Sequence, residues 1–115
     1  MKSSFGSVNI GGLTYEEDLV VHVDGEISKR KKKKSRELKL IYGHTPLSER
    51  ELDFLDKEKP EVVYVGTGYD GALPITPKAL KILEKYETVV QPTPNIIEKL
   101  VTEKRKHVAL IHVTC

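Results

Sequence analysis

The chain has 115 residues, of which 38% are hydrophobic, and a net charge of +2. This length fits one domain, so the expected organisation is a single α/β domain over residues 1–115. The sequence has neither the ~18–20 consecutive apolar residues that a membrane span needs nor an apolar leader, and its one cysteine, Cys115, cannot form an intramolecular disulfide. These features predict a cytoplasmic protein with no membrane partner. A composition rich in Lys and Glu is typical of thermophilic proteins.

The first third of the chain predicts β structure. Residues 5–10 alternate apolar with small or polar side chains, which is the pattern of a half-buried strand. A second strand is expected over residues 18–23 and a third over residues 26–30. The Asp24-Gly25 pair between them favours a two-residue type I′ hairpin. Residues 37–42 are interpreted as another short extended piece.

The remaining two thirds alternate helix and strand. Ser48 and Glu51 have the spacing of a capping box, which opens a predicted helix that ends near Pro60. Two later helices are each predicted to begin at a Thr-Pro pair, with Thr76 and Thr93 as the capping residues. Apolar strands are expected at residues 61–65, 88–91 and 108–113. The alternation predicts a mixed, partly parallel sheet with helices packed on it.

Several short motifs occur along the chain in a recognisable order. They are Phe5-Gly6-x-x-x-Ile10, Gly12-x-x-Tyr15-x-x-Asp18, Gly66-Thr67-Gly68, Pro92-Thr93 and the ending Ile111-His112-Val113-Thr114-Cys115. In this order and spacing, the chain resembles the family that includes the adipogenesis-associated Mth-domain protein and mitochondrial complex I assembly factor 3. The resemblance implies a single three-layer α/β domain. It has a central mixed sheet with one strand antiparallel to the others, preceded by an N-terminal β-hairpin region. It implies no known reaction.

A glycine-rich loop follows the strand predicted at residues 61–65. Gly66-x-Gly68-x-x-Gly71 matches the dinucleotide fingerprint in its letters, but the next helix begins only at Thr76, too late to face a pyrophosphate. No cofactor is therefore expected. The loop is interpreted either as a turn or as a backbone-amide nest for a small polar or anionic ligand, because ligands bind beyond the carboxyl ends of parallel strands. The candidate ligand-binding residues are Gly66, Thr67, Gly68, Tyr69, Asp70, Gly71, Thr93 and Asn95.

A basic run at residues 29–36 contains seven of the 19 basic residues and no acidic one, whereas the rest of the chain has 12 basic and 17 acidic residues. The candidate nucleic-acid contacts are Lys29, Arg30, Lys31, Lys32, Lys33, Lys34 and Arg36. Such a run binds phosphates by releasing counterions. The favoured alternative is a solvated edge strand and loop, because no aromatic side chains are interleaved for base stacking.

No metal site or catalytic residue is predicted. His112 and Cys115 would point to opposite faces of a strand, so His112 is expected to be a hydrogen-bonded, partly buried polar residue. The leading hypothesis is a non-enzymatic module that binds a protein partner or a small polar ligand. Two alternatives remain, an enzyme acting on a small polar or anionic substrate at residues 66–71 and a non-specific nucleic-acid binder. A homodimer is left open.

Overall fold

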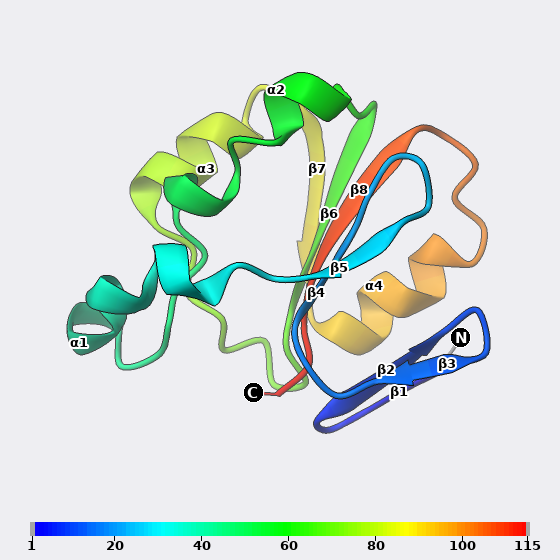
Figure 1. The fold of residues 1–115 in the computed structure, drawn as a ribbon, viewed down its shortest axis with the longest axis horizontal. Coiled ribbons are helices and arrows are strands. Elements are labelled where there is room, and N and C mark those ends of the chain that lie inside the picture. Colours follow the sequence, from blue (N-terminus) through cyan, green and yellow to red (C-terminus); the bar gives the residue numbers. More distant parts are fainter. Residues whose placement is uncertain (1, 115) are drawn as a thin grey trace.

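A five-stranded mixed sheet lies at the centre of the computed structural model, which describes residues 2–114 (Figure 1). The strand order is β5-β4-β8-β6-β7. Its strands are β4 (Leu19–Val21), β5 (Ile27–Lys29), β6 (Val62–Thr67), β7 (Glu87–Gln91) and β8 (His107–His112). β6 is parallel to β7 and β8, and β4 is antiparallel to β5 and β8. β4 therefore runs opposite to the other four strands, as the sequence resemblance implies.

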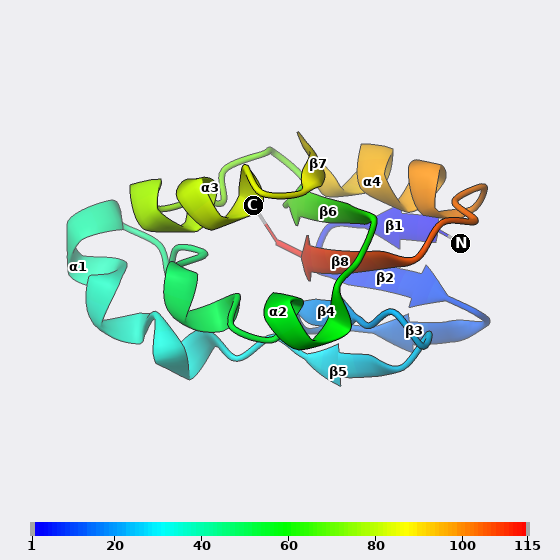
Figure 2. The ribbon, with the colours of Figure 1, turned by 90° about the horizontal axis from the view of Figure 1, so that it is seen from above.

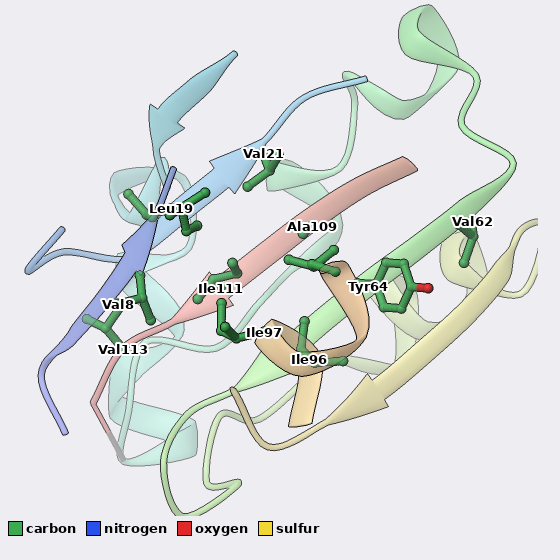
Figure 3. Close-up of a cluster of buried hydrophobic side chains, with 12 residues drawn as sticks. Val8, Leu19, Val21, Val62, Tyr64, Ile96, Ile97, Ala109, Ile111 and Val113 are labelled. Atoms are coloured by element: carbon green, nitrogen blue, oxygen red, sulfur yellow. The ribbon is translucent and has the colours of Figure 1, made fainter. Parts of the chain in front are cut away.

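The N-terminal region forms a second, smaller sheet. β1 (Lys2–Ser4), β2 (Ser7–Ile10) and β3 (Leu13–Tyr15) make an antiparallel meander, where a single strand was predicted at residues 5–10. This sheet and helix α4 (Thr93–Leu100) lie over the same face of the central sheet (Figures 1 and 2). Figure 3 shows the hydrophobic core on this face, where side chains of the N-terminal sheet and of α4 pack against the strands of the central sheet. Its labelled members are Val8, Leu19, Val21, Val62, Tyr64, Ile96, Ile97, Ala109, Ile111 and Val113.

The opposite face of the sheet carries the other helical layer. Helices α2 (Leu55–Glu58) and α3 (Pro77–Leu83) cover it, which completes three layers (Figure 2). The side chains that fill this second core are Val20, Leu47, Leu52, Leu55, Val63, Val65, Leu73, Ala79, Leu83, Val108 and Leu110. Because both faces of β6 are covered, all six of its residues are buried, which explains its continuous apolar sequence.

The turn between β4 and β5 differs from the predicted type I′ hairpin. Only Gly25 has a positive φ, of 86°, whereas a type I′ turn needs positive φ at both central residues. The loop has three residues, 23–25, closed by the bonds from the amide of His22 to the carbonyl of Glu26 (2.8 Å) and from the amide of Gly25 to the carbonyl of His22 (2.9 Å). The strands on either side are those predicted.

The segment between β5 and β6 contains the largest errors of the sequence analysis. The predicted extended piece at residues 37–42 is helical and consists of a 3₁₀ turn, Arg36–Leu38, followed by α1 (Lys39–Tyr42). The predicted helix from Ser48 is broken into a 3₁₀ turn, Glu49–Glu51, and α2. Ser48 makes no capping bond there, because its hydroxyl has another partner.

Of the two predicted Thr-Pro caps, one is confirmed. The side chain of Thr76 accepts a hydrogen bond from the amide of Ala79 at 3.2 Å, and Pro77 occupies the first turn of α3. Thr93 is not a cap, as described below. Within the described residues, no helix has the length and apolar character needed to cross a membrane.

Candidate functional site

The glycine-rich loop lies at the carboxyl end of β6, as predicted, and it also contacts the segment after β8. The amides of Gly68, Tyr69 and Gly71 are each bonded within the protein. Their acceptors are the Thr93 hydroxyl at 2.9 Å, the Thr114 carbonyl at 2.6 Å and the Gly68 carbonyl at 3.3 Å. The hypothesis of an amide nest for an anion therefore loses these three donors.

Thr93 fastens α4 to the ends of the two central strands. It is the first residue of α4, preceded by Pro92 at the cap position, and its hydroxyl makes no capping bond. The hydroxyl instead accepts from the amide of Gly68 and donates to the carbonyl of His112 at 2.6 Å. A Cβ on Gly66 would come within 2.8 Å of this hydroxyl, so glycine is required for the close approach. With both roles filled, the Thr93 hydroxyl is not free for a ligand.

The other predicted ligand residues do not converge on one cavity. Thr67 is buried, whereas Tyr69 and Asp70 are exposed. Tyr69 packs edge-on against Phe5, with ring centroids 6.2 Å apart. Asn95 lines a different surface depression, together with residues of α4 and its flanks. The structure thus unites Gly66, Gly68 and Thr93 in a tightly bonded corner of the fold.

Arg30, within the basic run, is buried in an ion-pair network. Its side chain is 2% exposed. The guanidinium binds Glu51 in a bidentate fashion, with Nε–Oε1 at 2.7 Å and Nη2–Oε2 at 2.9 Å, and binds Asp18 Oδ2 through Nη1 at 3.0 Å. Nη2 also donates to the carbonyl of Pro46 at 2.7 Å. Arg30 therefore cannot contact a phosphate backbone, and its grouping with the solvent-facing lysines is wrong.

Two buried serines complete the network around Glu51. The Ser35 hydroxyl donates to Oε2 of Glu51 at 2.6 Å and lies 2.5 Å from the Ser48 hydroxyl. This contact explains the failure of the predicted capping box: the Glu51 carboxylate turns inward to Arg30 and Ser35, and Ser48 bonds to Ser35. The network ties the start of the segment after β5 to the 3₁₀ turn Glu49–Glu51.

Asp18 joins the network to the end of β8. Its Oδ2 contacts Nδ1 of His112 at 2.7 Å and Nζ of Lys32 at 3.3 Å, and its Oδ1 accepts from the amide of Val113 at 3.0 Å. Burial opposes ionisation of Asp18, but the bond and attraction from His112, the Val113 amide and Lys32 together outweigh it and hold the pKa of Asp18 well below its usual range. For Arg30, burial would lower the pKa, and the two carboxylates overcome that and raise it.

His112 is a hydrogen-bonded, partly buried residue, as predicted. Besides Asp18, its ring contacts the Thr114 hydroxyl through Nε2 at 3.2 Å. Cys115, the other half of the His-x-x-Cys motif, lies outside the described residues. Across residues 2–114, no group of three or more His, Cys, Asp or Glu side chains is placed to hold a metal ion.

Lys29 is the exposed last residue of β5 and pairs with Glu17 at 2.9 Å, and the rest of the basic run belongs to a loop, residues 31–45, which we call the basic loop. It contains six basic residues and one acidic residue. Lys31, Lys32 and Lys33 are exposed, and residues 32–34 form a 3₁₀ turn. The loop extends beyond the edge of the central sheet and carries α1 at its far end (Figure 1). Leu40 and Ile41 of α1 are 97% and 76% exposed, so two large apolar side chains stand at the tip of a cationic loop.

Asp18, Glu51, Leu40 and Ile41 were not assigned to any site from the sequence; Asp18 was noted only within a motif and Glu51 only within a capping box. No local pattern pairs Arg30 with carboxylates 12 and 21 residues away along the chain. A signal for the loop tip was present in the sequence, because Leu40 and Ile41 closely follow six basic residues, but they were assigned to a short extended piece.

Among known proteins, the chain is similar to solved structures. No family model and no curated protein matches it. The structure described as conserved hypothetical protein PH1505 from Pyrococcus horikoshii OT3 is 32% identical, with a TM-score of 0.86 over 100% of this chain and 98% of that chain. The chain belongs to the family of PH1505. A second structure, MT938, is 35% identical, with a TM-score of 0.81 over 100% of this chain and 96% of that one. Neither description mentions an Mth domain or an assembly factor, so that resemblance stays a prediction.

Proposed function

We propose that the chain is a cytoplasmic protein-interaction module and that the basic loop is its docking element. The observation that carries this proposal is the exposure of Leu40 and Ile41, 97% and 76%, at the tip of a loop with six basic residues. The glycine-rich corner supports a small-ligand role less well, because its amides and the Thr93 hydroxyl are already bonded.

The two apolar side chains supply the affinity in this proposal. Burying a Leu or Ile side chain that is otherwise exposed contributes about 1.5–3 kcal/mol. The lysines around it contribute mainly to the rate of association and to the choice of partner, by attracting an acidic surface. The expected partner is therefore a protein that presents an apolar pocket surrounded by Asp and Glu side chains.

The base of the basic loop is held rigidly, which favours binding. Ser35 is fully buried and bonded to Glu51, and Lys32 reaches Asp18. Further contacts are the ion pair of Arg50 with Glu37 and that of Lys34 with Asp53 at 3.4 Å. A loop that is already ordered loses less conformational entropy on binding than a mobile one.

The experiment is affinity capture from an extract of the source cells with three matched baits. The baits are wild type, the double variant Leu40→Ser/Ile41→Ser, and the control Val101→Ser, which removes an exposed apolar residue (61%) from the end of α4. Wild type and the control are expected to retain the same partner, and the double variant to lose it by about 10-fold or more, since buried apolar anchors dominate interface energies.

Three results would contradict the proposal. The first is that the double variant captures the partner as well as wild type does. The second is that wild type binds anionic lipid vesicles and captures no protein. The third is that wild type sediments as a dimer that the double variant converts to a monomer, which would make the loop a self-association surface.

A further inference from the structure

A second histidine, away from the sheet edge described above, lies between a carboxylate and a serine. Nδ1 of His22 is 2.6 Å from Oε2 of Glu58, and Nε2 of His22 is 2.7 Å from Oγ of Ser28. His22 directly follows β4, Ser28 lies on the neighbouring strand β5, and Glu58 is the last residue of α2. The β4–β5 hairpin therefore supplies the hydroxyl and the imidazole, and α2, about a third of the chain away, supplies the carboxylate, with Glu58 36 residues from His22.

The chemistry of these groups fixes the direction of the bonds. An ionised carboxylate only accepts hydrogen bonds, so Nδ1 of His22 carries the proton that it donates to Glu58. In the neutral ring, Nε2 is then the acceptor, and the Ser28 hydroxyl donates to it. This is the arrangement in which a histidine removes a proton from a serine nucleophile.

The imidazole is held in place by its surroundings. The other oxygen of Glu58 accepts from the amide of Val23 at 3.0 Å, which orients the carboxylate. Phe54 packs edge-on against the His22 ring, with centroids 5.5 Å apart and planes at 70°. The side chains of His22 and Glu58 are only 23% and 19% exposed. The ring is thus preorganised for proton transfer at Nε2.

Two hollows flank Ser28 and His22. One is a small cavity of about 60 Å³, whose lining combines the apolar Val20, Phe54 and Leu110 with the charged Lys29, Lys31, Lys34, Glu51 and Asp53. The other is an open depression of about 460 Å³, also lined by Lys31. The apolar side chains of this small cavity suit a short acyl group, and the lysines in its lining suit a negatively charged neighbour.

We propose that Ser28, His22 and Glu58 form a hydrolytic site for a short-chain acyl ester whose alcohol part is anionic. The inference goes beyond the proposed docking function and does not depend on it. It also differs from the sequence analysis, which predicted no catalytic residue.

In the first half of the reaction, Ser28 Oγ attacks the acyl carbonyl carbon, and its proton passes to Nε2 of His22. The tetrahedral intermediate carries a negative oxygen, for which Lys31 supplies the positive charge. The ester C–O bond then breaks, and the proton on His22 passes to the alcohol oxygen as the alcohol leaves. Glu58 stabilises the imidazolium throughout.

In the second half, water attacks the acyl-Ser28 ester and gives a proton to His22. The bond between the acyl carbon and Ser28 Oγ breaks, and His22 returns the proton to Oγ. The products are a carboxylic acid and an alcohol, and no oxidant, reductant or metal is needed.

The bonds of Glu58 to His22 and to the Val23 amide also fasten α2 to the β4–β5 hairpin, so the test separates catalysis from folding. The full chain is assayed with p-nitrophenyl acetate and labelled with a fluorophosphonate, which reacts with activated serines. The variants are Ser28→Ala, His22→Gln and Glu58→Gln. The control is His107→Gln, which alters a histidine whose Nδ1 contacts only the carbonyl of Arg105 in the described hydrogen bonds. Melting curves accompany each variant.

We expect labelling on Ser28 and a loss of esterase rate of about 10²–10⁴-fold in Ser28→Ala and His22→Gln, with a wild-type rate in His107→Gln. Ser28→Ala removes one oxygen and leaves the His22–Glu58 bond, so it is the decisive variant if His22→Gln unfolds. The proposal is overturned if Ser28→Ala is folded and hydrolyses the ester at the wild-type rate, or if the label falls on another residue.

Discussion

Arg30 and the lysines that follow it are neighbours in sequence and opposites in structure. The side chain of Arg30 is 2% exposed and satisfies two carboxylates and a backbone carbonyl, whereas that of Lys32 is 44% exposed. Arginine suits the buried position because its planar fork binds a carboxylate through two parallel bonds, which a lysine ammonium cannot do. One run of basic residues thus contains a structural part and a solvent-facing part.

The structural part supports the solvent-facing part. The buried network of Arg30, Glu51 and Ser35 holds the base of the basic loop, and the loop carries Leu40 and Ile41 outward from that base. A high density of charge along a sequence therefore does not by itself indicate a binding surface. Substitutions in the structural part should therefore lower stability, whereas substitutions in the solvent-facing part should weaken binding and leave stability almost unchanged.

The largest expected effect is on the buried side. Arg30→Met should lower the free energy of unfolding by about 3–5 kcal/mol, because it leaves the Asp18 and Glu51 carboxylates buried without their cation. Lys33→Met, three residues later on the exposed loop, should change it by no more than about 0.5 kcal/mol. Urea unfolding of both variants measures the difference. A loss below about 1 kcal/mol in Arg30→Met would show that the two carboxylates find other partners.

The pH dependence of stability should sharpen the same comparison. The folded-state pKa of Asp18 lies well below its usual value of 3.8, so the unfolded chain binds more protons at acidic pH. The stabilisation from this carboxylate is therefore complete above about pH 4–5 and is lost as the pH falls below that range. Asp18→Asn should cost about 1–3 kcal/mol at pH 7, because its buried partners lose a charged acceptor.

The measurement is unfolding at a series of pH values from 7 to 2.5. Wild type should lose more stability across this range than Asp18→Asn does. Equal losses in the two proteins would mean that other carboxylates account for the acid sensitivity. Glu103, whose pKa the hydrogen bonds from Arg105 and Tyr64 lower to about 2, contributes equally to both and cancels in the comparison.

A third effect is expected in the glycine-rich corner. Gly68 has φ of 99°, a conformation in which a β-branched residue is strained. Gly68→Val should therefore cost about 1–3 kcal/mol. Ala72→Val, at an exposed position in the same region, is the matched control and should be close to neutral. An unchanged melting midpoint in Gly68→Val would show that the loop adjusts without cost.

Much of the fold was accessible from the sequence, because it depends on local periodicity. The buried strand β6 and the cap at Thr76 follow from runs of apolar residues and from a Thr-Pro pair, and both were predicted. The basic loop has no apolar period to indicate its helical turns. Thr93 has the sequence of a cap, but its hydroxyl bonds instead to the Gly68 amide and the His112 carbonyl at the ends of the neighbouring strands.

The candidate site was less accessible, because its residues meet only in three dimensions. Asp18 and His112 are 94 residues apart in the chain, and His22 and Glu58 are 36 apart. The carboxyl end of β6 was predictable from the sequence, but the bonds between polar side chains there were not. The alignment of strands that are distant in the sequence determines these contacts, and that alignment depends on the packing of the whole sheet.

The smallest expected effect concerns nucleic acid. Lys31→Gln combined with Lys33→Gln should leave stability unchanged within about 0.5 kcal/mol. Any binding of wild type to duplex or single-stranded DNA should be weak, independent of sequence and lost with added salt. The affinity of the double variant for DNA should fall less steeply with increasing salt concentration than that of wild type. Tight, sequence-dependent binding at physiological salt would instead assign the basic loop to nucleic-acid recognition.

The most direct test of the docking proposal is site-specific photo-crosslinking. A photoreactive phenylalanine analogue is placed at Ile41, at the tip of the basic loop, or at Val101, which is also exposed but lies beyond α4. Both proteins are irradiated in source-cell extract at physiological salt. The account predicts a discrete adduct with one acidic protein from position 41 and none from position 101. Adducts of equal yield at both positions, or none at position 41, would contradict it.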